Sequence, residues 1–109
     1  MATNTKILGQ SKPSATTLTA LYTVPSATTT VCSSIVICNQ SGTPTTFRIS
    51  VAVAGAGDTA SQYLYYDAPI GSYGTFIATI GITLGATDVV RVYNTLATCS
   101  FNLFGQEIS

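Results

Sequence analysis

Charge is scarce in this chain of 109 residues. Four basic and four acidic side chains make up 7% of the residues, whereas an ordinary soluble domain is about a quarter charged. A folded monomer of 11.3 kDa would expose roughly 5,700 Å², or about one charge per 700 Å². Because the net charge is zero, little electrostatic repulsion would keep copies of the molecule apart. We therefore predict a protein that associates.

Histidine is absent from the sequence. Acid–base catalysis near neutral pH relies mainly on histidine, or on another titratable group whose pKa is shifted by its surroundings. The acids are scattered more than eight positions apart, at Asp58, Asp67, Asp88 and Glu107. We therefore expect no enzyme, no catalytic residue and no cofactor.

Clustered basic residues and long apolar stretches are also missing. Lys6 and Lys12 lie near the start, and Arg48 and Arg91 fall on different predicted strands, so no basic patch is available to neutralise phosphates. No stretch approaches the roughly 18 apolar residues of a membrane span. The first ten residues, MATNTKILGQ, lack the pattern of a secretory signal, so we expect the mature chain to begin near Met1. We expect neither a nucleic-acid nor a membrane partner.

The three cysteines predict neither a metal site nor a catalytic nucleophile. Cys32 and Cys38 fall six positions apart in one predicted strand, which places them on the same face but roughly 20 Å from each other, too far for a disulfide. Cys99 could meet one of them across a sheet, leaving an odd thiol that suits a reducing cytoplasm. Without histidine the set is a poor zinc site and lacks a base to activate a thiol. We expect small buried hydrophobes and no metal.

Strand patterns run through most of the chain, and no 3.6-residue periodicity accompanies them. Thr and Ser supply 30 of the 109 residues, and β-branched and aromatic residues dominate the apolar stretches. In the clearest strand, 45–54, the side chains of Phe47, Ile49, Val51 and Val53 point one way. Similar alternation occurs in Val31, Ser33, Ile35 and Ile37, in Phe76, Ala78, Ile80 and Ile82, and in Cys99, Phe101 and Leu103. Further strands are expected at 6–10, 18–24, 62–67 and 89–94.

Turn signals between these segments predict an all-β fold. About eight short strands indicate a two-sheet antiparallel β-sandwich, either jelly-roll or immunoglobulin-like. The residues expected between the sheets are Ile35, Phe47, Ile49, Val51, Ile80, Val92, Phe101 and Leu103. Residues 18–109 are expected to form the single sandwich domain.

Residues 1–17 are interpreted as an N-terminal arm or as a first edge strand. Ile7 and Leu8 form an apolar pair in this otherwise polar segment. An extended stretch of ten residues could reach about 33 Å and add a strand to a neighbouring subunit. A frayed terminus is the alternative.

A run of tyrosines supplies the other candidate contacts. Alternation in Tyr63-Leu64-Tyr65-Tyr66 puts Tyr63 and Tyr65 on one face, with Leu64 and Tyr66 on the other. Tyrosines on a sheet could stack on sugar rings or anchor a partner protein, or they could pack across strands. Tyr63, Tyr65 and Tyr66, with Ile7 and Leu8, are the candidate assembly contacts.

Five segments together resemble short structural proteins of the virions of tailed bacteriophages, including phages of cyanobacteria. They are 21–25 (LYTVP), 33–39 (SSIVICN), 46–51 (TFRISV), 63–67 (YLYYD) and 100–105 (SFNLFG). The resemblance implies a non-enzymatic component of the virion, assembled in the host cytoplasm. It would decorate or cement the capsid through self-association and through contacts with virion proteins such as the major capsid protein.

Two alternatives to capsid decoration stay open. The same resemblance fits a tail, neck, fibre or baseplate component. A carbohydrate-binding β-sandwich is a different class, but such modules usually use tryptophan as a stacking platform, and this chain has none. Because the resembling virion parts commonly form threefold assemblies, we expect a homotrimer.

Overall fold

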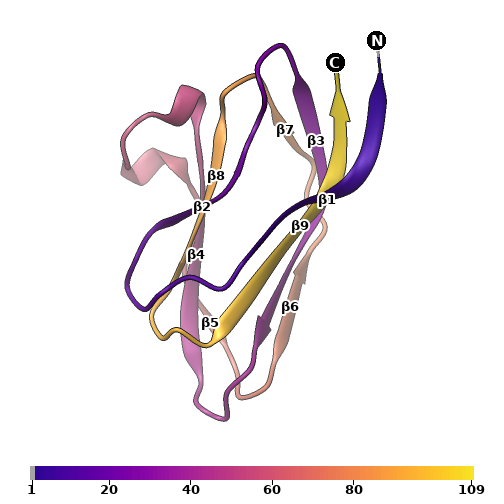
Figure 1. Ribbon diagram of the computed structural model, residues 1–109. Coiled ribbons are helices and arrows are strands. Elements are labelled where there is room, and N and C mark those ends of the chain that lie inside the picture. Colours follow the sequence, from indigo (N-terminus) through magenta and orange to yellow (C-terminus); the bar gives the residue numbers. More distant parts are fainter. Residues whose placement is uncertain (1) are drawn as a thin grey trace.

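Residues 2–109, which the computed structural model describes, form two antiparallel sheets packed against each other (Figure 1). One sheet has five strands, in the order β1-β9-β3-β6 with β7 also on β3, and the other has four, in the order β2-β8-β4-β5. The strands are β1 (Thr3–Ser11), β2 (Thr19–Thr23), β3 (Thr29–Asn39), β4 (Thr45–Ala52), β5 (Tyr63–Ile70), β6 (Thr75–Ala78), β7 (Ile82–Leu84), β8 (Val89–Asn94) and β9 (Cys99–Ile108). The prediction of an all-β sandwich is confirmed.

The strand order is that of a jelly roll. The pairs are nested along the chain: β4 with β5, β3 with β6 and β7, β2 with β8, and β1 with β9. Such nesting corresponds to one long hairpin wrapped into two sheets, which gives the two Greek keys of this fold. The strand expected through Ile80 is interrupted, because β6 ends at Ala78 and β7 begins at Ile82. Both halves still pair with β3.

The core lies between the two sheets and consists mainly of the alternate strand residues that the sequence predicts to be buried. Six of the eight residues expected there have relative exposures of 0–1%: Ile35, Phe47, Ile49, Val92, Phe101 and Leu103. Val51 and Ile80 are half-buried and pack against this cluster. Burying a large apolar side chain contributes about 1.5–3 kcal/mol, so these residues supply much of the stability of the sandwich.

A β-bulge at Ser33 changes the faces of β3. Cys32 is paired with Gly105 and Ser34 with Phe104, so Ser33 is an extra residue in the ladder. The alternation therefore shifts by one residue at this point. Cys32 is buried, whereas Cys38 lies on the opposite face and is half-buried. The expectation that these two cysteines share a face is wrong for this reason.

Strand β4 ends two residues earlier than expected. A segment of residues 53–62, with two short 3₁₀ turns, begins there and folds back over the outer face of the four-stranded sheet. It covers Ala52 and Val89, which are 0% and 8% exposed and lie outside the main core cluster. Val53, which was expected to point the same way as Phe47, Ile49 and Val51, is 76% exposed because it belongs to this segment.

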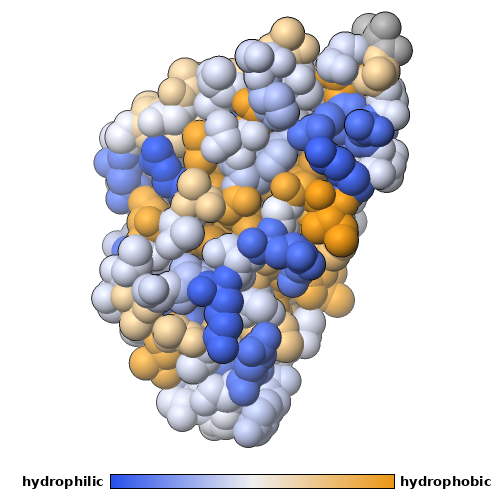
Figure 2. Space-filling model, viewed as in Figure 1, coloured by the Kyte–Doolittle hydropathy of each residue, from blue (hydrophilic) through white to orange (hydrophobic). Residues whose placement is uncertain are grey.

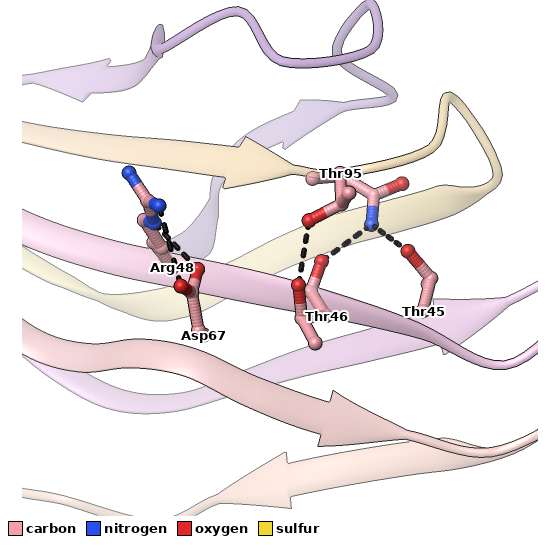
Figure 3. A network of polar contacts seen from close by, with 6 residues as sticks. Thr45, Thr46, Arg48, Asp67 and Thr95 are labelled. Carbon is pink, nitrogen blue, oxygen red and sulfur yellow. Dashed lines mark hydrogen bonds and ion pairs between the residues drawn. The ribbon is translucent and has the colours of Figure 1, made fainter.

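Two buried asparagines anchor the loops at one end of the sandwich. The side-chain amide of Asn94 donates to the carbonyl of Thr46 and the hydroxyl of Thr45, and its oxygen accepts the backbone amides of Thr98 and Cys99. Figure 3 shows Thr45 and Thr46 on β4, with Thr95 directly after the end of β8. The side-chain amide of Asn39 likewise donates to the carbonyls of Thr43 and Gly71, and its oxygen accepts the backbone amide of Ser41. These side chains replace hydrogen bonds that the turning backbone loses.

The N-terminal segment adds its strand to the sheet of its own chain. Strand β1 pairs with β9 from Thr3 to Ser11, and Ala2 and Ser109 exchange backbone hydrogen bonds. The two ends of the chain consequently lie side by side (Figure 1). Strand β1 occupies the edge of the five-stranded sheet, so the N–H and C=O groups along its outer side have no neighbouring strand within residues 2–109.

Gly105 should be intolerant of a side chain. A Cβ atom built on Gly105 would lie 2.2 Å from the carbonyl oxygen of Val31, whereas one built on Gly57 would meet nothing within 4 Å. We expect Gly105→Ala to lower the free energy of unfolding by about 1–3 kcal/mol through overpacking. The matched variant Gly57→Ala should stay within about 0.5 kcal/mol of the parent. Denaturant titration measures both, and equal midpoints for the two variants would contradict the close approach at Gly105.

Asn94 should contribute far more to the free energy of unfolding than a less buried asparagine. Asn94→Ala would remove the acceptor that the backbone amides of Thr98 and Cys99 use, so we expect a loss of about 2–4 kcal/mol. Asn102→Ala is the control, because Asn102 is half-buried and accepts one bond, from the side chain of Gln10. Chemical denaturation followed by tyrosine fluorescence compares the two. A loss at Asn94 no larger than at Asn102 would show that the loops do not depend on it.

Candidate assembly surfaces

A second bulge sets the directions of the tyrosines on β5. Phe47 is paired with Ala68 and Ile49 with Tyr65, so both Tyr66 and Asp67 lie opposite Arg48. Asp67 has a φ of 50°, a left-handed conformation that aspartate adopts more readily than most residues. This irregularity breaks the expected alternation.

Tyr63 and Tyr65 do not share a face, contrary to the expectation from alternation. A further register shift is the cause, because Ile49 is paired with Tyr65 and Ser50 with Tyr63, which leaves Leu64 as an extra residue between the two tyrosines. Tyr65 points inward and its ring centroid lies 5.4 Å from that of Phe76 and 6.1 Å from that of Phe47. Tyr63 packs instead on Tyr66, with centroids 5.1 Å apart and an interplanar angle of 86°. Tyr65 thus belongs to the partly buried shell of the core, and Tyr63 and Tyr66 belong to the outer side of the four-stranded sheet.

Arg48 is the centre of a cluster on this outer side. Its guanidinium carbon lies 4.1 Å from the ring centroid of Tyr66 and 4.3 Å from that of Tyr93. The guanidinium also donates to both carboxylate oxygens of Asp67, at 2.7 and 3.3 Å (Figure 3). Cation–π and bidentate contacts of this kind hold an arginine in one orientation. We call Arg48, Tyr63, Tyr66, Asp67 and Tyr93 the Arg48 cluster.

The Arg48 cluster satisfies its own charges. The bond to Asp67 raises the pKa of Arg48 further above its ordinary value. Burial, followed by the nearby Asp58, raises the pKa of Tyr63. Arg48 packs on the Tyr66 ring across neighbouring strands, and Tyr63 packs edge-on with Tyr66 along the same strand. Packing within the chain therefore accounts for these contacts. Tyr66 is still 61% exposed, and the neighbouring Leu64 is 42% exposed.

The structure places Ile7 and Leu8 on different sides of β1. Ile7 is opposite Phe104 on β9, and Gly9 is opposite Leu103, so Leu8 is the extra residue of a bulge. Leu8 packs against the core, whereas Ile7 is 52% exposed on the outer side. The two side chains therefore do not form one apolar anchor.

Ile7 belongs to a larger surface that the sequence pattern did not reveal. Strand pairing shows which residues of the five-stranded sheet point away from the core, because directly paired residues share a face. These residues define the outer face of the five-stranded sheet: Thr3, Thr5, Ile7, Gln10, Thr29, Val31, Ser34, Val36, Cys38, Thr75, Ile77, Thr83, Ser100, Asn102, Phe104, Gln106 and Ile108. None of them is charged. Finding this surface required the two bulges, at Leu8 and Ser33, which shift the alternation.

One corner of this outer face is polar and slightly hollow. The hollow has a volume of about 370 Å³ and is lined by Gln10, Ser11, Lys12, Ser100, Phe101 and Asn102. Lys12 is the charged residue that borders the outer face. Figure 2 shows that strongly hydrophilic atoms form separate groups on the visible side of the molecule, with a hydrophobic patch over the region of β1 and β9.

A polar network ties the two sheets together near the chain ends. The hydroxyl of Tyr22, on β2, donates to the carboxylate of Glu107, on β9, and also contacts the hydroxyl of Thr30. Lys6 forms an ion pair with Glu107 at 2.9 Å. The bond from Tyr22, followed by that from Lys6, lowers the pKa of Glu107, and burial with the Glu107 contact raises the pKa of Tyr22 to about 12. The network stabilises the charged carboxylate and the neutral phenol together.

Two other charged residues, Asp88 and Arg91, form hydrogen bonds to the backbone of the same chain. Asp88 accepts the backbone amides of Ala54 and Gly85, both at 2.9 Å, and Arg91 donates to the carbonyl of Gly55 at 3.1 Å. These bonds hold the covering segment 53–62 against the sheet. Asp88 thus caps a turn, as expected for an isolated loop carboxylate.

The cysteines are free thiols in this structure. Burial raises the pKa of Cys32 to about 11 and also raises that of Cys99, which makes both thiols poor nucleophiles. Cys32 and Cys99 are buried, as expected for small hydrophobes, whereas Cys38 is half-buried on the outer face of the five-stranded sheet.

No family model matches the chain, and no curated protein matches it. Among residues 2–109, no group of three or more His, Cys, Asp or Glu side chains is placed to hold a metal ion. No helix in the described part of the chain is long and apolar enough to cross a membrane.

The network at Glu107 predicts acid-dependent stability. The pKa of Glu107 is lowered on folding from an ordinary value of 4.5, so its contribution is complete above that pH and is lost as the pH falls through the folded-state value. We expect the parent to exceed Glu107→Gln in stability at neutral pH, and the difference to shrink in acid. Denaturant midpoints measured from neutral pH downward test this expectation. A difference that is independent of pH would contradict it.

Proposed function

We propose that this protein is a non-enzymatic structural subunit of a bacteriophage virion, which decorates or cements the capsid. It would act by binding copies of itself and other virion proteins, such as the major capsid protein. A place in the tail, neck, fibre or baseplate is the alternative within the same class. In either place the protein supplies a binding surface and a stable fold.

The observation that carries the proposal is the neutral, partly apolar surface of the sandwich. The chain exposes 5345 Å² with eight charged residues, and the pairs Lys6–Glu107 and Arg48–Asp67 are already bonded within the chain. Large exposed apolar side chains include Ile7, Ile77 and Tyr73, at 52%, 63% and 72%. Exposed apolar patches on a soluble protein mark interaction sites, and repeated subunits would cover such patches in many copies.

The fold adds an argument by analogy. Jelly rolls recur in viral capsid proteins and in lectins, although a fold alone does not determine a function. The sequence resemblance to short virion proteins supports the first of these two classes. The neutral surface agrees with assembly.

Self-association is the first consequence to measure. We expect sedimentation velocity at micromolar concentration to give a mass above that of the 11.3 kDa chain. Because the contact would be neutral, raising the salt concentration should not dissociate it, whereas a contact between opposite charges would weaken. A stable monomer at these concentrations would contradict the proposed self-association.

The position on the particle needs a separate experiment. Antibody labelling of intact particles in electron micrographs distinguishes a head protein from a tail protein. Label on the head would support capsid decoration, and label on the tail would support the alternative. Particles without label would contradict the virion assignment while leaving self-association to the sedimentation result.

A further inference from the structure

The outer face of the five-stranded sheet carries no charged side chain, unlike the outer side of the four-stranded sheet. The charged residues of its own strands, Lys6 and Glu107, are paired opposite Gly105 and Thr30 and therefore point to the inner side, where they bond to each other. Arg48, Asp67 and Arg91 lie on the outer side of the other sheet or beside its covering segment. Lys12 borders one corner of the face. The rest of the outer face of the five-stranded sheet has no charged side chain.

This outer face is also large enough for a specific contact. Strand β9 has ten residues and the sheet is four strands across, which gives roughly 33 Å by 19 Å. A copy would therefore bury about 600 Å², and two copies about 1,200 Å², which reaches the lower limit for stable interfaces. Two sheet surfaces can pack face to face about 10 Å apart.

Its side chains form rows that suit dry packing. One row contains Ile7, Phe104 and Ser34, and the next contains Val36 and Ile77 with two amides. The amides bond to each other, since Gln10 donates to Asn102 at 2.8 Å, so covering this row would cost less than burying free amides. Ile77 is 63% exposed.

We infer that the outer face of the five-stranded sheet binds the same face of a second copy of this chain. A twofold contact brings each patch against itself, so any uncompensated charge at its centre would meet its own copy. A neutral face avoids that repulsion, whereas the outer side of the four-stranded sheet carries Arg91, which bonds to the Gly55 carbonyl and to no carboxylate among residues 2–109. This inference rests on the proposed self-association and specifies its surface. It also replaces the expected threefold arrangement with a twofold one.

The test places one charge on each outer face of the sandwich. Ile77→Lys puts an ammonium in the middle of the inferred contact, and Leu64→Lys puts the same group on β5 of the other sheet. Both side chains are substantially exposed, at 63% and 42%, so both variants should fold, which circular dichroism checks. We expect the parent and Leu64→Lys to sediment at twice the chain mass. Ile77→Lys should raise the dissociation constant about tenfold or more.

The outcomes separate this inference from the proposed function. If the parent associates and Ile77→Lys associates equally well, the assigned face is wrong while self-association stands. A mass of three chains would likewise overturn the twofold contact alone. If the parent is a monomer, the proposed self-association fails together with the inference, while labelling of particles still tests the place in the virion.

Cys38 provides a second measurement on the same proteins. It lies on the outer face of the five-stranded sheet, whereas Cys32 and Cys99 are buried inside the sandwich. Association of two copies should cover Cys38. Maleimide should therefore label Cys38 more slowly in the parent and in Leu64→Lys than in Ile77→Lys. Equal labelling rates in all three proteins would overturn the inferred contact.

Discussion

The pairing of β3 with β9 is the interaction on which the rest of the structure depends. These strands are central in the five-stranded sheet and receive β1 on one side and β6 with β7 on the other. The bulge at Ser33 lets β3 pair with β9 along its whole length, and it requires a glycine at position 105, where a Cβ atom would meet the Val31 carbonyl. A change at this point would shift which side chains enter the core, because strand faces alternate with a period of two.

The few charges of the chain stabilise its own fold. Glu107 accepts from Tyr22 and Lys6 and so joins the two sheets near the chain ends. Arg48 lies between two tyrosine rings and bonds to Asp67 across neighbouring strands. Charges placed in this way satisfy each other locally, and a charge held by several partners is unavailable to repel another copy. The scarcity of charge and its placement therefore act together to leave the surface neutral.

The two outer faces of the sandwich differ for a structural reason. The four-stranded sheet is partly covered by residues 53–62, which bury Ala52 and Val89 on that side and bring Asp88 and Arg91 into contact with the backbone. The five-stranded sheet has no such covering segment among residues 2–109, so Ile7 and Ile77 stay largely exposed on its outer face. A second sheet surface is the natural complement of a flat sheet face, because rows of side chains on the two surfaces can interdigitate.

The sequence by itself determined the all-β class, the approximate strands and most of the core, because β-branched alternation and turn residues are local signals. Phe47, Phe101 and Leu103 could be assigned to the core from their strands alone. Only the tertiary structure decided the jelly-roll order, the opposite faces of Cys32 and Cys38, and the separation of Tyr65 from Tyr63. Each of these depends on pairing between distant segments: a single bulge reverses every following side chain, and composition carries no signal for where it falls. The neutral outer face depends on the same pairing, because its residues come from strands far apart in the chain.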